Sequence, residues 1–329
     1  RVGLGGKFDL VSRESALLTN NVLLIVAAAS VLLGTLYPLF LDALDLGKIS
    51  VGPPYFESVF VPLMAPAVFL MGIGPLARWK QARLPELATR LTWAFAVAVV
   101  TAAIVPFVMG RWSPMIFLGL ALAFWVVASS VVNLRDRVSQ LRASNGGDTA
   151  KALRAQPRGY WGMLLAHFGV AVFIIGVTMV RGYETEKDVK MKAGDVVEIG
   201  GYGFRLDGFT RRNGPNYEAT VGNVTVLKNG QAQRVMQPEK RFYPVQQMPM
   251  TEADMDSGLT RDLYVSLGEP VGDDAWIVRV YHKPFINWIW GGGFLMALGG
   301  LLALTDRRYR LARREDVAKA RAGAAPAAA

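Results

Sequence analysis

Six long apolar runs constrain this chain more than any other feature of its sequence. None of them holds an Asp, Glu, Lys or Arg well inside it, and they lie near 16–41, 59–77, 90–109, 113–134, 160–180 and 285–304. A helix needs roughly 17 to 25 residues to cross about 30 Å of hydrocarbon. A helix also satisfies all its backbone polar groups within one segment, as a bilayer requires. We therefore predict an all-α polytopic membrane bundle of about six transmembrane helices.

The basic residues predict how this bundle is oriented. The segments before the first run, between the second and third, between the fourth and fifth, and after the sixth hold 20 Lys and Arg against 8 Asp and Glu. The opposite short loops hold only Lys48 and Arg111. We expect a multi-pass protein of the bacterial inner membrane. By the positive-inside rule, both termini are expected in the cytoplasm and residues 181–284 in the periplasm.

The residues between the fifth and sixth runs differ from the rest of the chain in their hydrophobic pattern. Short β-type stretches occur at 195–199, 204–209, 217–227, 263–267 and 275–281, and Asn229-Gly230 is a hairpin signal. We predict a small antiparallel barrel or sandwich. The expected organisation is therefore helices one to five in 1–180, a periplasmic β domain in 181–284, the sixth helix in 285–304 and a cytoplasmic basic tail in 305–329.

The charge and cysteine content exclude several classes of function. The net charge is +10, but 181–284 carries 14 basic and 15 acidic residues, so the positive excess belongs to the membrane loops. These loops favour anionic lipid headgroups and not nucleic acid. With no cysteine, the chain has no disulfide and no thiolate site, so any redox role requires a bound cofactor. Because Arg1 is not an initiator methionine, we expect a piece of a longer protein.

Only one of the two histidines lies inside an apolar run. His167 is about seven residues from the predicted cytoplasmic end of the fifth run. Two roles are open to it: a neutral imidazole hydrogen-bonded between helices, or an axial ligand of a membrane-embedded haem. Nearby small residues leave room for a flat macrocycle, but they equally permit close helix packing. A bis-histidine haem would need a second imidazole from outside this chain. Those small residues are Gly162, Ala166, Gly169 and Gly176.

Other polar groups have simpler explanations. His282 is expected to be an interfacial surface residue, beside an aromatic belt at Trp288 and Trp290. Helix capping and contacts between helices explain the polar groups at 12–14 and 20–21, with a quinone or haem-propionate contact as a minority hypothesis. The external motifs at 214–217 and 238–241 are interpreted as turns and solvated charges.

Taken in order, these motifs resemble the CcmF family, the haem lyase subunits of bacterial cytochrome c maturation. The resemblance runs along essentially the whole chain, but it covers only the carboxy-terminal half of the family's length. It rests on Ser12-Arg13-Glu14 with Asn20-Asn21, Gly34-Thr-Leu-Tyr-Pro38, Val51-Gly-Pro-Pro-Tyr-Phe56, Ala166-His-Phe-Gly169, Gly214-Pro-Asn-Tyr217, Pro238-Glu-Lys-Arg241, Trp288-Ile-Trp-Gly-Gly292 and Asp306-Arg-Arg-Tyr-Arg310.

The resemblance implies a function in cytochrome c-type biogenesis. Family members join haem, a transient substrate, to the cysteine thiols of apocytochrome c by thioether bonds. The haem comes from the chaperone CcmE, and the subunits CcmH and CcmI keep the thiols reduced and positioned. A b-type haem, reduced by quinol, keeps the incoming iron ferrous. Carried onto this sequence, His167 matches one axial ligand of that haem iron.

Departures from the family limit this expectation. The tryptophan-rich external motif, its flanking histidines and the second haem ligand are absent, and they belong to the amino-terminal half of the same protein. We therefore expect 1–329 to be inactive alone as a holocytochrome c synthase, and the catalytic residues are unknown. The alternatives are a quinol-oxidising haem b respiratory subunit, and a secondary transporter, which would usually place charged residues within its helices.

Overall fold

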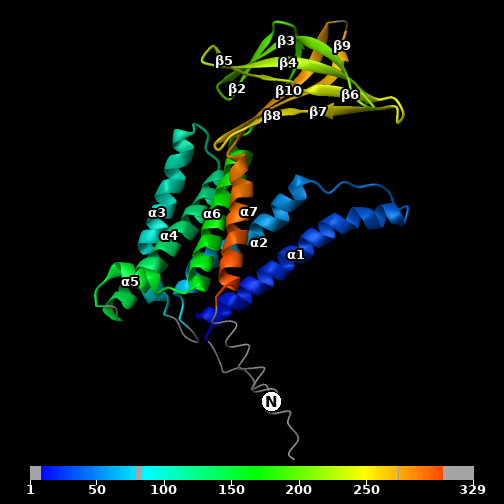
Figure 1. Cartoon of the computed structure of the whole chain (residues 1–329). Coiled ribbons are helices and arrows are strands. Elements are labelled where there is room, and N and C mark those ends of the chain that lie inside the picture. Colours follow the sequence, from blue (N-terminus) through cyan, green and yellow to red (C-terminus); the bar gives the residue numbers. More distant parts are fainter. Residues whose placement is uncertain (1–8, 79–82, 145, 273, 307–329) are drawn as a thin grey trace, which may run out of the picture. The chain divides into compact units, whose positions relative to one another are not determined.

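The fold was analysed in a computed structural model, which describes residues 9–78, 83–144, 146–272 and 274–306 (Figure 1). Most of the predicted basic tail in 305–329 and Arg1 lie outside these residues. The chain divides into two compact units, one formed by 1–174 with 292–329 and the other by 175–291. The second unit includes the end of one long helix and the beginning of another.

Within the described residues, six helices are long and apolar enough to cross a membrane. The prediction of a membrane helical bundle with about six spans is confirmed. The helices are α1 (Arg13–Ala43), α2 (Pro53–Ile73, extended by the 3-10 turn η1, Gly74–Leu76), α3 (Leu84–Val108), α4 (Pro114–Ser144), α6 (Arg158–Tyr183) and α7 (Ile286–Leu304), with a short α5 (Thr149–Arg154) between α4 and α6.

Two helix starts follow directly from proline chemistry. α2 begins at Pro53, about six residues before the predicted run, because Pro53 and Pro54 occupy the first helical turn, where no backbone donor is needed. α4 likewise begins at Pro114, soon after Gly110, whose φ of +74° lets the chain turn back from α3. A short, tight connection therefore joins α3 to α4.

Small residues form the contacts inside the bundle. Ala94, Ala98 and Ala102 of α3 are almost wholly buried, as is Ala123 of α4. A few large side chains, such as Leu120 and Trp125, are buried as well, but many others are exposed, and Phe107 is 89% exposed. Lipid tails are as apolar as leucine, so helices in a bilayer gain more from close backbone approach than from burying large apolar groups.

Residues 175–291 contain two antiparallel sheets, so the predicted small antiparallel β domain is confirmed as a sandwich. One sheet has the order β1-β10-β9-β8 and the other β2-β3-β4-β6-β7, with β5 also paired to β4. The strands are β1 (Thr185–Lys192), β2 (Val196–Ile199), β3 (Tyr202–Asn213), β4 (Glu218–Lys228), β5 (Gln231–Met236), β6 (Glu239–Tyr243), β7 (Met248–Glu252), β8 (Asp254–Ser257), β9 (Arg261–Val271) and β10 (Ala275–Pro284).

The sandwich core comes from inward-facing residues of both sheets. Phe204, Leu206, Leu263 and Val265 are all fully buried. The hairpin predicted at Asn229-Gly230 is confirmed, because both residues have positive φ and β4 pairs with β5 across them. The core thus sits between strands that the alternating sequence pattern had identified.

The interpretation of 238–241 as a turn with solvated charges was wrong. Glu239–Tyr243 is strand β6, and the Glu239 side chain is only 9% exposed. Its carboxylate accepts hydrogen bonds from Arg212 at 2.7 Å and Arg241 at 2.8 Å. A buried carboxylate paired to two guanidinium groups in this way cannot be recognised from a run of charged letters, because Arg212 is 27 residues away.

Candidate functional site around His167

His167 lies in the first half of α6, and its orientation is set by the helix itself. Its Nδ1 is 2.7 Å from the carbonyl oxygen of Met163, one turn earlier. A carbonyl oxygen only accepts, so Nδ1 carries the hydrogen and the lone pair of the neutral ring resides on Nε2. Metal-ligating histidines commonly donate their second ring N–H to a backbone carbonyl in this manner. The side chain is therefore held in the tautomer that an Nε2 ligand requires.

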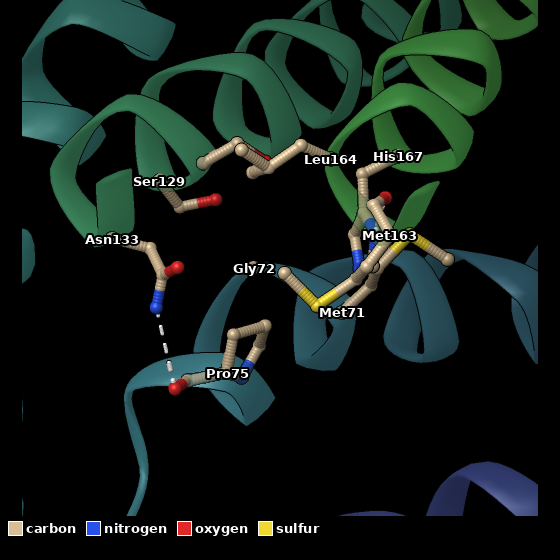
Figure 2. Close-up of a pocket in the computed structure, with 9 residues that line it drawn as sticks. Met71, Gly72, Pro75, Ser129, Asn133, Met163, Leu164 and His167 are labelled. Atoms are coloured by element: carbon tan, nitrogen blue, oxygen red, sulfur yellow. Dashed lines mark hydrogen bonds between the residues drawn. The ribbon is translucent and has the colours of Figure 1, made fainter. Parts of the chain in front are cut away.

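Residues from three elements surround the imidazole. Figure 2 shows His167 and Met163 of α6 facing Met71 of α2, with Ser129 of α4 on the far side of the same pocket. Gly72, Pro75, Ser130, Asn133 and Leu164 complete the lining. Thioether and aliphatic groups thus lie on one side of the pocket and hydroxyl and amide groups on the other.

A polar network joins the wall of this pocket to the ends of α4 and α6. Asn133 donates to the carbonyl of Pro75 at 3.3 Å and accepts from the Tyr160 hydroxyl at 2.7 Å. The Arg137 guanidinium lies 4.5 Å from the Tyr160 ring centre and donates to Gln156 at 2.6 Å. These contacts tie η1, α4 and α6 together beside the imidazole and hold the polar wall in place.

The glycines of α6 face α7 and not a cofactor space. A Cβ at Gly162, Gly169 or Gly176 would lie 2.5–2.7 Å from α7 atoms, mostly of its backbone, so the two helices are in direct contact there, side by side as in Figure 1. Of the two possibilities that the sequence left open, the structure therefore favours close helix packing. The spacing of seven residues between these glycines is the signal for this contact.

The environment of His167 suits axial ligation of a haem from one side. The residues supply a neutral imidazole with a free Nε2 and soft, apolar neighbours, which is the donor chemistry that haem iron accepts. The pocket itself encloses only about 10 Å³, far less than the roughly 300–1,000 Å³ typical of small-molecule sites. The described residues thus fit an axial ligand, and most of a macrocycle would extend beyond this pocket.

Other residues singled out in the sequence have mainly structural contacts. Ser12 caps α1 by accepting from the Ser15 backbone N–H at 3.1 Å, so capping explains this polar segment. Gly34 lies against the ring of Tyr55, whose hydroxyl donates to the Ser30 carbonyl at 3.1 Å. Two motifs far apart in the sequence, 34–38 and 51–56, are thereby brought together between α1 and α2.

His282 is packed and not freely exposed. Gly200, at a φ of +57°, lies directly against its ring, and the ring stacks on Tyr202 with centroids 6.1 Å apart. The pKa of His282 lies below its ordinary value, chiefly because burial disfavours the charged imidazolium and also because Arg261 is nearby. His282 therefore remains neutral in the sandwich and contributes to its packing.

Comparison with known proteins identifies the class of fold to which this chain is similar. Residues 182–284 match the profile of a family described as the CcmF C-terminal beta-sandwich. A solved structure titled Cytochrome c Heme Lyase CcmF resembles the chain with a TM-score of 0.67, covering 90% of this chain and 46% of that one at 24% identity. At that identity the likeness concerns the fold alone, a membrane helical bundle that carries a small β-sandwich.

Sequence relatives define the family. The chain is 46% identical over 304 residues to the cytochrome c-type biogenesis protein CcmF of Pseudomonas aeruginosa, and 43% identical over 302 residues to that of Escherichia coli. It is 41% identical over 319 residues to the protein ccl1 of Rhodobacter capsulatus. These matches cover 92–96% of this chain and 45–48% of each relative. The chain thus belongs to the CcmF family, corresponds to its carboxy-terminal half and spans about half the length of these relatives.

Proposed function

We propose that this chain is the carboxy-terminal, haem-ligating part of a haem lyase that attaches haem to apocytochrome c. The observation that carries the proposal is the orientation of His167, whose Nδ1–H donates to Met163 and leaves Nε2 free inside an apolar helix bundle. Family membership supplies the reaction class, because the relatives are named for cytochrome c-type biogenesis.

His167 serves as one axial ligand of a b-type haem in this proposal. The chain contains only one other histidine, His282, and it belongs to the separate sandwich unit. For a bis-histidine haem, the second imidazole would come from the amino-terminal half of the same protein, as the family resemblance implies, and 1–329 alone would be inactive. When bound, the b haem supplies an electron, drawn from quinol, for the haem substrate. The helix around His167 orients the ligand, and the packed α6–α7 pair keeps its position rigid.

The remaining assignments follow from charge and family. The distribution of basic residues supports a topology in the bacterial inner membrane with both termini in the cytoplasm and the sandwich in the periplasm. The sandwich then lies on the side where the haem chaperone CcmE and apocytochrome c meet, together with the subunits CcmH and CcmI. Its nearly balanced charge, 14 basic and 15 acidic residues in 181–284, suits a docking or scaffold surface for proteins.

The test compares the two histidines in the complete protein purified in detergent. We expect His167→Ala to abolish the low-spin b-type absorption spectrum and cytochrome c maturation, because the iron loses an axial ligand. The matched variant His282→Ala should keep the spectrum. In His167→Gly, added imidazole should restore the spectrum in part, since it can occupy the vacated ligand position.

An unchanged spectrum in His167→Ala would disprove the ligand assignment. Loss of maturation with an intact spectrum in that variant would instead assign His167 to another step. Steady oxidation of quinol by the protein in the absence of both apocytochrome and chaperone would favour the respiratory subunit over the lyase.

A further inference from the structure

The turn between β8 and β9 is fastened to the beginning of α7. The residues from Gly258 to Arg261 close this hairpin, with the Gly258 N–H donating to the Arg261 carbonyl at 2.9 Å. Three successive carbonyls of the turn then accept hydrogen bonds from the start of α7. The donors are the Asn287 side chain to Gly258 at 2.8 Å, the Trp288 indole to Leu259 at 3.0 Å and the Phe285 backbone to Thr260 at 2.9 Å.

A network of side-chain hydrogen bonds strengthens this junction. The Asp262 carboxylate accepts from the Gly258 N–H at 3.1 Å, from Asn287 at 2.9 Å and from Ser257 at 2.8 Å. Phe285 adopts a φ of +57°, an unusual value for an aromatic residue, which turns the chain from β10 into the helix. The turn and the first residues of α7 therefore form one rigid piece.

The length of α7 indicates how deep the β8–β9 turn and the first residues of α7 lie relative to the bilayer. The helix has 19 residues, which rise about 28 Å at 1.5 Å each, close to the 30 Å or so of hydrocarbon. Because all 19 residues are needed to cross the hydrocarbon, the first turn of α7 lies at the hydrocarbon boundary. Trp288 and Trp290 occupy that level, as interfacial tryptophans commonly do. The carbonyl of Leu259, held by the Trp288 indole, lies at the same level.

The side chains around the turn match the chemistry of a headgroup layer. Leu259 is 78% exposed at the tip and Trp290 is 76% exposed on the helix. The basic residues nearest in the sequence are already paired within the protein, Arg261 with Asp256 at 2.7 Å and Lys283 with Glu184 at 3.8 Å, so the apolar tip is the part of the turn that is open to lipid. An exposed leucine on a rigid turn, with a tryptophan indole bonded to its carbonyl, is suited to the boundary between acyl chains and headgroups.

We propose that the β8–β9 turn, residues 258–261, is a lipid-binding element of the sandwich that inserts Leu259 into the headgroup region of the bilayer. Its occupant is the membrane surface and not another protein, because the turn is bonded directly to the first residues of a membrane-spanning helix. The sandwich thereby gains an attachment to the bilayer besides its covalent links to α6 and α7.

The absence of cysteine makes the test direct, because each variant then carries a single thiol. The full chain in nanodiscs would be labelled with an environment-sensitive nitrobenzoxadiazole dye at Leu259→Cys. The matched control is Val245→Cys, 88% exposed in the turn between β6 and β7. Thr260→Cys, one residue further along the lipid-binding turn, serves as a second variant should Leu259→Cys fold poorly.

We expect dye at position 259 to show blue-shifted emission and to be quenched several-fold more by lipids carrying a shallow doxyl group than dye at position 245. Aqueous iodide should show the opposite preference. Equal, water-like behaviour at both positions would overturn the proposal. Protection of position 259 from both quenchers would also overturn it, since a protein segment would then cover the turn.

Discussion

The helix bundle and the β-sandwich differ in how much of their large apolar surface they bury, since the bundle encloses a few large side chains such as Leu120 and Trp125 but leaves many others exposed. In the bundle, Ala98 and Ala102 are buried while Phe107 is 89% exposed. In the sandwich, Phe204 and Leu206 are fully buried, and charged side chains cover the outer faces. The helix bundle and the β-sandwich of one chain thus differ in how they pack, and the change occurs where α6 joins β1 and β10 joins α7.

The difference reflects the solvent around each unit. Water penalises exposed apolar surface at roughly 25 cal/mol per Å², so the sandwich gains stability by enclosing its large side chains. Lipid does not penalise that surface, so the bundle depends on dispersion contacts between closely spaced backbones. Gly162 and Gly169 of α6 are placed where a side chain would separate the helices, and Gly34 and Gly72 are placed where an aromatic ring of a neighbouring helix packs.

The largest expected effect comes from truncating the same residue type in the two units. Phe204→Ala should destabilise the sandwich by about 3–5 kcal/mol, because it removes a buried ring and leaves a cavity. Phe107→Ala should change stability by no more than about 0.5 kcal/mol, since that ring faces the surroundings of the bundle. Unfolding of both variants in detergent, followed by near-ultraviolet circular dichroism, would measure the difference. Equal losses would refute the two-solvent description.

A smaller effect is expected from adding volume between helices. Gly169→Leu should destabilise the bundle by about 1–3 kcal/mol or more, because its Cβ would lie 2.7 Å from the backbone nitrogen of Met296. The matched variant Gly300→Leu should be tolerated, as nothing lies within 4 Å of a Cβ there. Thermal unfolding and monodispersity in detergent would compare the two. If both variants behave alike, the α6–α7 contact is not close-packed.

The smallest effect is a pH dependence confined to the sandwich. Because the pKa of His282 is lower in the folded state than its usual 6.5, the unfolded chain binds a proton more readily. Stability should therefore fall as the pH drops below about 6.5 and level off below the folded pKa. The charged groups near the ring are Arg261 and, over the Tyr202 face, Lys228.

His282→Gln is the variant that tests this dependence. Its unfolding midpoint, measured at pH 7.5 and 5.0, should change less than that of the unaltered protein. A difference between the two pH values that is the same in both proteins would show that other groups account for the titration.

Prediction from sequence succeeded where one local pattern decides the structure. Each apolar run became a helix, and Pro53 and Pro114 marked helix starts more closely than hydropathy did. It failed for strands β1, β7 and β8, which lie at sheet edges and bury few residues, so that their alternation is weak. β6 was missed because its buried Glu239 is neutralised by arginines on β3 and on its own strand.

For the candidate site, the sequence identified His167 as the one ionisable group inside a span, but it left the role of the neighbouring glycines open. Only the three-dimensional contacts assign those glycines to α7 and the Met163 carbonyl to the imidazole. The pocket residues from α2 and α4 also had no sequence signal, because nothing local relates Met71 or Ser129 to a histidine far along the chain.

The sequence by itself determined that this chain spans a membrane, where it does so and that a β domain interrupts the last two spans. Length and apolarity are local properties, and a bilayer imposes them on each segment separately. The tertiary structure decided which faces of those segments meet, how the β8–β9 turn is bonded to α7 and how His167 is oriented. Those outcomes depend on pairs of residues brought together only by folding, such as Leu259 with Trp288.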